Sequence, residues 1–104
     1  MIYITGPIDE NNKEDTKERF AQAEEYLKHE VFAYEDHGVF NTYTQFFEKK
    51  KYKDIKSELM ARFRAINSCD KLYFLVGWEK DQVARVEHEF AKVIGMRVIY
   101  SKKF

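Results

Sequence analysis

The sequence predicts an α/β fold in which helices cover a parallel sheet, and three neighbouring patterns indicate it. Residues 72–76 are five apolar residues in a row that end at Gly77, which is typical of a short strand buried on both faces. A second extended apolar run, 97–100, follows Gly95, a residue that commonly ends a helix. Between the two runs, apolar residues recur at the spacing of one helical face: Val83, Val86, Phe90, Val93 and Ile94.

The length and charge of the chain restrict the possible classes of protein. Its 104 residues suffice for one domain, 1–104, with a core of its own. The 18 lysines and arginines are balanced by 18 aspartates and glutamates, so we expect neither a nucleic acid nor a membrane as partner. The one basic run, 49–53, is interpreted as a solvated helix end or loop, and a nucleic-acid or phosphate contact is its alternative. We expect no signal peptide and no membrane span, because no stretch approaches about 18 apolar residues.

The cysteine and histidine content indicates the cellular setting and gives no sign of a metal. The single cysteine, Cys69, cannot form an internal disulfide, which favours a reducing, cytoplasmic location. The histidines, His29, His37 and His88, are scattered without cysteine or carboxylate partners at metal-ligand spacing. We therefore assign no metal and expect no cofactor.

The N-terminal third predicts a strand followed by an amphipathic helix. Residues 2–5 form a short β-rich run that stops at the turn signal Gly6-Pro7. Asp15 and Glu18 have the spacing of a capping box, so we expect Asp15 to cap the helix. Apolar residues then mark one helical face: Phe20, Ala23 and Leu27.

The middle third is less regular. Residues 31–34 predict the second strand, and residues 35–41 predict a loop. The segment 42–53 has two interpretations, a short helix or a lid built from its aromatic residues Tyr43, Phe46 and Phe47. Another helix is expected over residues 54–67, where apolar residues again share one face: Ile55, Leu59, Phe63 and Ile66.

Strands and helices that alternate in this way require a parallel sheet with right-handed crossovers. The economical arrangement is a flavodoxin-like three-layer sandwich with four parallel strands in the order 2-1-3-4. Its switch point lies between the first and third strands, which places residues 5–7 beside residues 77–82. Open α/β sheets bind ligands at such a point, so we expect a ligand crevice there.

Glu87 is the candidate reactive residue of this crevice. It follows Val86 directly, so it lies at the flank of the predicted buried stripe and can point along the sheet edge. A carboxylate held over the mouth of a parallel sheet is a candidate nucleophile or general base. The same pattern is also compatible with an ordinary solvated helix glutamate.

Four short motifs, taken in order, carry a resemblance to a known family. They are Ile2-Tyr3-Ile4-Thr5-Gly6-Pro7, Cys69-Asp70, the segment 75–79 and the helix that contains Glu87. In these motifs the chain resembles the nucleoside 2-deoxyribosyltransferase-like family, especially its short phage and bacterial members. The match spans nearly the whole chain.

The resemblance implies glycosyl chemistry on a small nucleoside or nucleotide. In active members of the family, a glutamate attacks the anomeric carbon of a 2-deoxyribonucleoside and expels the base, and the sugar then passes to another base or to water. This implies that Glu87 is the nucleophile, that Asp81 is the acidic residue at the start of the same motif, and that Tyr3 orients Glu87. Substrate contacts are expected from the loops and one helix: Gly6, Pro7, Gly77, Trp78 and Arg62.

Two departures from the family pattern keep a second hypothesis open. Val83 replaces the family's glycine, and Arg62 stands where active members usually carry an aspartate that handles the leaving base. Replacing an acid with a cation reverses the local field. The alternative function is therefore a nucleoside- or nucleotide-binding module whose chemistry is impaired.

A homo-oligomer, a dimer or higher, is expected with either function. A four-stranded sheet with few helices leaves one layer thinly covered, and aromatic residues make up 16% of the chain. The helix over residues 54–67 is the interface candidate, because Met60, Phe63 and Ile66 extend its apolar face.

Overall fold

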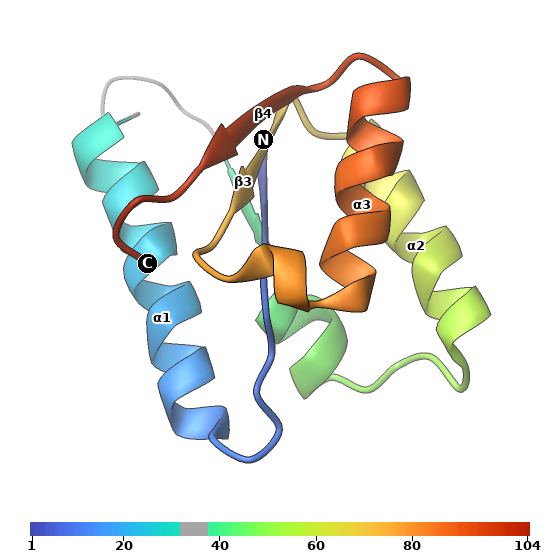
Figure 1. Cartoon of the computed structure of the whole chain (residues 1–104), viewed down its shortest axis with the longest axis horizontal. Helices are drawn as coiled ribbons and strands as arrows, with labels where there is room; N and C mark the ends of the chain where they lie inside the picture. Colours follow the sequence, from blue (N-terminus) through green and yellow to red (C-terminus); the bar gives the residue numbers. More distant parts are fainter. Residues whose placement is uncertain (32–37) are drawn as a thin grey trace.

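Four strands form one parallel sheet in the order β2-β1-β3-β4 (Figure 1). They are β1 (Ile2–Thr5), β2 (Val39–Asn41), β3 (Lys71–Phe74) and β4 (Arg97–Tyr100). The computed structural model describes residues 1–31 and 38–104. The predicted strand order 2-1-3-4 is confirmed, and the arrangement is that of a flavodoxin-like α/β fold.

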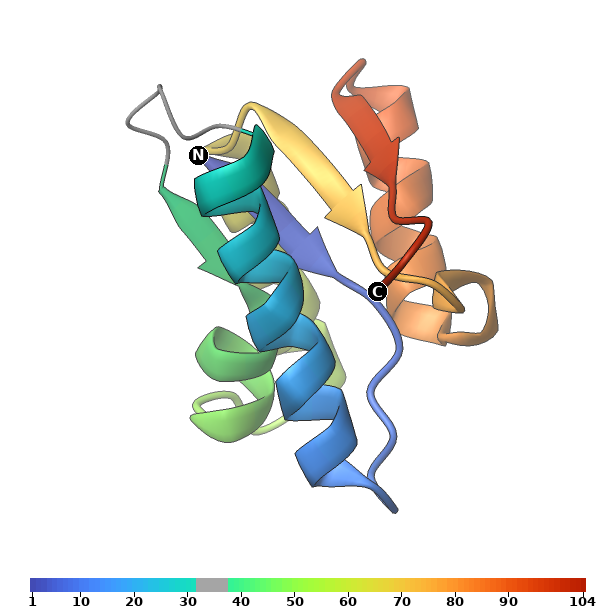
Figure 2. The same cartoon turned by 90° about the vertical axis from the view of Figure 1, so that its left-hand side faces the viewer.

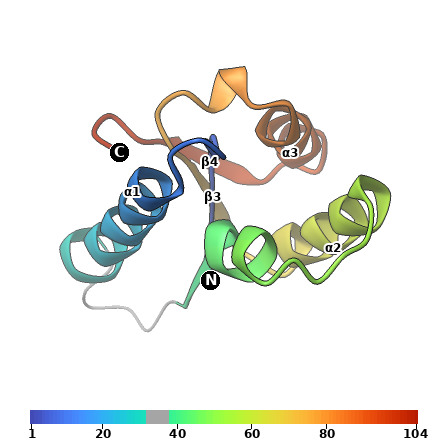
Figure 3. The ribbon, with the colours of Figure 1, turned by 90° about the horizontal axis from the view of Figure 1, so that it is seen from below.

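Helices cover both faces of this sheet. One face carries α1 (Lys13–Tyr26), which lies in front of the strands in Figure 2. The other face carries α2 (Ile55–Asn67) and α3 (Gln82–Val93), opposite α1 in Figure 3. Three short turns complete the described chain: the π-helical turns η1 (Leu27–Val31) and η2 (Tyr43–Glu48), and the 3-10 turn η3 (Trp78–Lys80). Among the described residues, no helix is long and apolar enough to cross a membrane.

The alternation of side chains in β1 divides the core into two halves. Ile2 and Ile4 pack with Phe20 of α1 on one face of the sheet. Tyr3 belongs to the core cluster on the α2 and α3 side. All four residues of β1 are buried, which requires cover on both faces. Because successive strand side chains point to opposite faces, Thr5 shares the face of Tyr3.

The second strand is not where the sequence predicted it. We expected a strand over 31–34 and a loop over 35–41. Val31 instead ends η1, residues 32–34 lie outside the described part of the chain, and the strand is Val39–Asn41.

Side-chain contacts explain why β2 forms at that position. The ring of Phe40 stacks on that of Tyr3 in β1, with 5.4 Å between centroids and 8° between planes. The side-chain oxygen of Asn41 accepts hydrogen bonds from the backbone N–H groups of Tyr43 and Thr44, at 3.0 and 3.3 Å. Asn41 therefore ends the strand by turning the chain into η2.

The segment after β2 combines features of both predicted alternatives. It forms a helical turn, η2, whose residues Tyr43 and Phe46 are buried in the core. Phe47 is only partly buried and packs at the edge of the α1-side core. A short helix is therefore the correct description of the backbone.

The start of α1 also differs from the prediction. Asn12 is the N-cap, and its side chain accepts a hydrogen bond from the backbone N–H of Asp15 at 3.4 Å. Glu18 does not reach back to a cap but accepts a hydrogen bond from Gln22 at 3.1 Å. The predicted capping box at Asp15 is wrong, because Asn12 already satisfies the helix start and Asp15 belongs to the first turn.

The buried face of α3 is not its apolar stripe. Its buried residues are Ala84, Glu87 and Ala91, whereas Val86 and Val93 are 38% and 80% exposed. The prediction that Glu87 flanks the buried face is therefore wrong, since Glu87 lies at its centre. Two alanines on that face leave room for the longer glutamate side chain to reach the sheet.

The predicted interface helix, α2, begins at Ile55, one residue after the expected start, and ends at Asn67 as expected. Its exposed surface differs from the prediction. Ile66 is 0% exposed and belongs to the core. Phe63 stacks on Phe90 of α3, with 4.3 Å between ring centroids. Of the three residues expected at an interface, only Met60 is largely exposed, at 53%.

Candidate functional site

Glu87 is completely buried, and three side chains donate hydrogen bonds to its carboxylate. The Tyr3 hydroxyl and Nη1 of Arg62 both donate to Oε2, the latter at 3.0 Å. The Thr5 hydroxyl donates to Oε1 at 2.6 Å. A buried charge is tolerated when it is paired and hydrogen-bonded, and all of these conditions are met here.

The secondary structure explains why these groups meet. Tyr3 and Thr5 are two residues apart in β1, so both point toward α3. Burial, followed by the negative charge of Glu87, raises the pKa of Tyr3 well above its ordinary value. The Tyr3 hydroxyl therefore keeps its proton and remains a donor to Glu87 at neutral pH.

Arg62 is itself held on several sides and is only 4% exposed. Its Nε donates to Oε2 of Glu58, one helical turn earlier, at 2.9 Å, and its guanidinium lies 4.7 Å from the ring centroid of Phe46. Burial alone lowers the pKa of Arg62, but the charges of Glu87 and Glu58 outweigh burial and the net shift is upward. The planar guanidinium thus bridges two carboxylates while stacking on a ring, which a lysine cannot do.

Asp81 connects the start of α3 to the loop after β1. It is the N-cap of α3, where Oδ1 accepts a hydrogen bond from the backbone N–H of Ala84 at 3.0 Å. Its Oδ2 accepts a hydrogen bond from the backbone N–H of Ile8 at 3.4 Å. Both carboxylate oxygens of Asp81 therefore accept backbone hydrogen bonds: one caps α3, and the other holds the loop after β1.

A crevice of about 240 Å³ opens where the loops after β1 and β3 meet. The two loops approach each other as predicted, since a Cβ on Gly77 would lie 3.4 Å from Cγ of Pro7. Gly6 has no room for a side chain, because its Cβ would lie 2.6 Å from Cβ of Leu75. The described residues that line the crevice are Thr5, Gly6, Ile8, Glu10, Phe47, Glu58, Arg62, Asp81 and Val83.

The wall of this crevice is more acidic than basic. Glu10, Glu58 and Asp81 contribute three carboxylates, and Arg62 is the one cation among the described lining residues. The charge of Arg62 is already shared between Glu58 and Glu87. Glu87 is not among the described lining residues and lies behind the wall. The crevice therefore favours an uncharged ligand over an anion.

Residues 1–100 match the family described as "Domain of unknown function (DUF4406)". The chain belongs to this family. No curated protein and no solved structure matches the chain. Because the family description carries no activity, membership of DUF4406 neither supports nor opposes the resemblance to the nucleoside 2-deoxyribosyltransferase-like family.

This DUF4406 domain brings five of the predicted site residues to the crevice or directly behind it. Tyr3, Arg62 and Glu87 are joined by hydrogen bonds. Gly6 and Asp81 line the crevice itself. Tyr3 lies in β1, Arg62 in α2 and Glu87 in α3, while Gly6 follows β1 and Asp81 caps α3. These positions are far apart in the sequence, and the fold brings them together.

The remaining predicted residues lie at the junction of the loops or away from it. Pro7 and Gly77 approach each other where the loops cross. The Trp78 ring stacks on His88 at 4.3 Å and on Tyr100 at 5.8 Å, and it lines a separate surface hollow with Gly77. Trp78 is therefore outside the described lining of the crevice.

Several residues that line the crevice were not predicted as site residues, among them Thr5, Ile8, Glu10, Phe47 and Glu58. Thr5 could have been found from its two-residue spacing to Tyr3, and Glu58 from its position four residues before Arg62. Glu10 and Phe47 lie in a polar loop and in the aromatic segment, where no spacing rule indicates a common site.

The cysteine of the domain offers no alternative chemistry at neutral pH. Cys69 is buried, and burial raises the pKa of its thiol to about 11. The thiol is therefore protonated and a poor nucleophile. Within residues 1–31 and 38–104, no group of three or more His, Cys, Asp or Glu side chains could hold a metal ion.

We expect Arg62→Leu to lower the free energy of unfolding by about 3–5 kcal/mol, because it leaves the charge of Glu87 buried without its partner. Urea denaturation at pH 7 measures the loss. Arg64→Leu, at an exposed arginine of the same helix, is the matched control and should stay within about 0.5 kcal/mol of the wild type.

The double variant Arg62→Leu/Glu87→Leu should be more stable than Arg62→Leu alone, since it removes both charges of the pair. The single variants Arg62→Leu and Glu87→Leu each lower the free energy of unfolding by a measured amount. If the double variant lowers it by the sum of these two amounts, Arg62 and Glu87 are not coupled and the prediction is contradicted.

Proposed function

We propose that this DUF4406 domain binds a small, uncharged nucleoside in the crevice and does not cleave it. The observation that carries the proposal is the state of Glu87, which is 0% exposed and has both oxygens engaged by Tyr3, Thr5 and Arg62. A nucleophile must bring a free lone pair to the anomeric carbon. The ligand class comes from the resemblance to the nucleoside 2-deoxyribosyltransferase-like family.

The size and charge of the crevice support an unphosphorylated ligand. At about 240 Å³, it is smaller than the roughly 300–1,000 Å³ of ordinary ligand sites, which suits one nucleoside better than a dinucleotide. A phosphate at 4 Å from Asp81 is repelled by about 1 kcal/mol per charge pair in water and by about 4 kcal/mol at an effective dielectric of 20. Arg62 offsets little of this repulsion, because Glu58 and Glu87 already share its charge.

We expect a 2-deoxynucleoside to bind the crevice more tightly than its 5′-monophosphate. In Asp81→Ser, we expect the ratio of the two dissociation constants to be closer to one. Serine caps a helix about as well as aspartate, so the variant removes a wall charge and keeps the start of α3. The affinity is measured by NMR titration from the shifts of the Gly6 and Ile8 amide resonances, because both residues line the crevice and so report on binding there.

Asp54→Ser is the matched control for this experiment. Asp54 caps α2 in the same way, accepting a hydrogen bond from the backbone N–H of Ser57 at 2.8 Å, but it does not line the crevice. The control should leave the preference unchanged. Tighter binding of the monophosphate by the wild type, at the Gly6 and Ile8 amides, would overturn the proposal.

A glycosyl-transferring or glycoside-hydrolysing enzyme is the second candidate. It is favoured by the hydrogen bond from Tyr3 to Glu87, the contact that the family resemblance implies for an oriented nucleophile. For this function, Arg62 and Thr5 must release Glu87 when substrate binds, so that its carboxylate can attack the sugar.

Mass spectrometry after incubation with a 2-fluoro-2-deoxynucleoside separates the two candidates. The fluorine destabilises an oxocarbenium-like transition state, so a covalent intermediate accumulates if one forms. The binding function predicts no adduct. An adduct on the wild type that is absent from Glu87→Gln would establish the enzyme instead.

We also propose that two copies associate through the outer surface of α2 and α3. Met60 and Val93 are 53% and 80% exposed, and each lies three residues from a member of the stacked Phe63–Phe90 pair. Exposed apolar side chains beside a stacked aromatic pair are typical of an interaction surface. Light scattering at micromolar concentration should give the mass of a dimer for the wild type and of a monomer for Val93→Lys; a monomeric wild type would contradict the dimer.

A further inference from the structure

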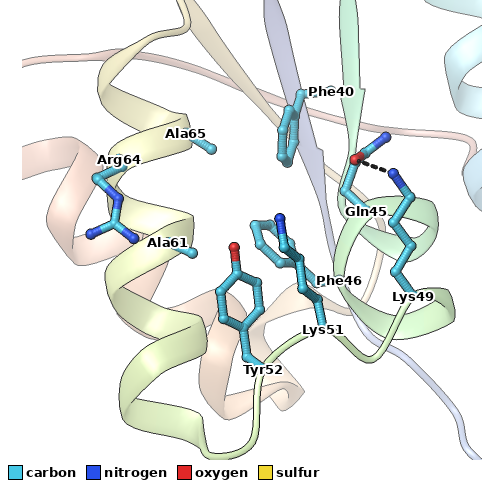
Figure 4. Close-up of a pocket in the computed structure, with 9 residues that line it drawn as sticks. All are labelled: Phe40, Gln45, Phe46, Lys49, Lys51, Tyr52, Ala61, Arg64 and Ala65. Carbon is cyan, nitrogen blue, oxygen red and sulfur yellow. Dashed lines mark hydrogen bonds between the residues drawn. The ribbon is translucent and has the colours of Figure 1, made fainter.

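A second cavity, of about 270 Å³, lies between η2 and α2 (Figure 4). It shares no described lining residue with the crevice. On the α2 side its wall carries two small side chains, Ala61 and Ala65, one helical turn apart. Aromatic rings face them from the other side (Figure 4). Small side chains opposite rings leave a slot that suits a flat ligand.

Three aromatic residues form the ring wall of this cavity. The centroids of Phe40 and Phe46 are 5.6 Å apart, and those of Phe46 and Tyr52 are 5.9 Å apart. Arg62 supports Phe46 through its guanidinium, which packs on the same ring. The Tyr52 hydroxyl points into the space between α2 and Phe40 in Figure 4. A nucleic acid base can stack on such rings in a sequence-tolerant way.

Three cations are among the described lining residues of the slot: Lys49, Lys51 and Arg64. In Figure 4 the Lys51 side chain lies beside the rings, Lys49 is turned toward Gln45, and the Arg64 side chain extends from α2 on the side away from the rings. None of the described lining residues is acidic, and none of these three cations forms an ion pair within residues 1–31 and 38–104. Lys49 donates one hydrogen bond to Gln45 at 3.1 Å, and the Lys51 ammonium lies 6.0 Å from the ring centroid of Tyr52. Their positive charge is uncompensated and attracts an anion.

The backbone at Lys50 brings two of these residues over the cavity. Lys50 has a φ of 46°, a left-handed conformation that is uncommon outside glycine. Its N–H donates to the carbonyl oxygen of Phe46 at 3.1 Å, which closes the end of η2. The chain therefore turns at Lys50, and Lys51 and Tyr52 line the cavity. The lysines of the basic run 49–53 are exposed, as predicted, but Lys51 and Tyr52 also form part of the cavity wall.

We propose that this second cavity binds a nucleoside phosphate, with the base against Tyr52 and the phosphate at the Lys51 ammonium, where the exposed Arg64 at the rim adds positive charge. The ring wall fits the base and the cations fit the phosphate, so one ligand accounts for both features. A free nucleotide and the phosphorylated end of a single strand share this chemistry. The inference does not depend on the function of the crevice, whose acidic wall disfavours phosphate.

Titration of the 15N-labelled protein with adenosine 5′-monophosphate, adenosine and inorganic phosphate tests the proposal. The monophosphate should shift the amide resonances of Phe40, Tyr52 and Ala65. It should bind at least about tenfold more tightly than adenosine or phosphate, because the two contacts then act on one molecule. Its affinity should fall as the salt concentration rises.

The double variant Lys51→Gln/Arg64→Gln should weaken binding of the monophosphate at least about tenfold, since charge-assisted hydrogen bonds to phosphate are lost. Both residues are exposed, so the fold should be retained. Lys53→Gln is the matched control: Lys53 is an exposed lysine of the same run that does not line the cavity. It should change the affinity by less than about twofold.

Two results would overturn the proposal: shifts confined to crevice amides such as that of Gly6, or an equal loss of affinity in Lys53→Gln and in the double variant. A 5′-phosphorylated trinucleotide in the same titration distinguishes the two sources of ligand. Affinity equal to that of the monophosphate assigns a free nucleotide, and affinity more than about tenfold higher assigns a strand end. Either outcome supports the site, provided that the shifts include Tyr52 and Ala65.

Discussion

The buried ion pair between Arg62 and Glu87 is the interaction on which the rest of the structure depends. A buried charge without its partner costs several kcal/mol, so both residues must be placed together. Tyr3 and Thr5 supply the remaining hydrogen bonds to Glu87, and Phe46 packs on the guanidinium. Four elements, β1, α2, α3 and η2, are therefore tied to one point below the crevice. Packing alone would fix them less strictly, because apolar contacts are not directional.

The same arginine separates two cavities of opposite charge. Arg62 lines the acidic crevice, while the ring on which it stacks, Phe46, lines the basic cavity on the other side. Because Glu58 and Glu87 compensate its charge, Arg62 adds little positive potential to either cavity. The charge of each cavity is then set by its outer residues, such as Asp81 in the crevice and Lys51 in the basic cavity. Under the two proposed binding functions, this arrangement would let a chain with no net charge bind an uncharged ligand in one cavity and an anionic ligand in the other.

The sequence predicted the sheet and its order, since apolar runs alternate with amphipathic helices, and the resemblance predicted the contact between Tyr3 and Glu87. It did not predict the buried face of α3, because an apolar pattern places a glutamate toward solvent. The groups that make its burial possible are distant: Arg62 is 25 residues and Tyr3 is 84 residues before Glu87. The strand β2 was misplaced for a similar reason. It is three residues long, and a stacking contact with Tyr3 in another strand accompanies it.

The identity of residue 62 also bears on the reactivity of Glu87. An enzyme accelerates a reaction only through interactions that are stronger in the transition state than in the ground state. When a carboxylate attacks a sugar carbon, its charge is lost as the bond forms, so a cation bound to the free carboxylate stabilises the ground state more than the transition state. For such an attack by Glu87, Arg62 would therefore raise the barrier, and more so the more strongly the two residues are paired. Under the proposed binding function, the arginine that stabilises the fold is also the residue that suppresses the chemistry.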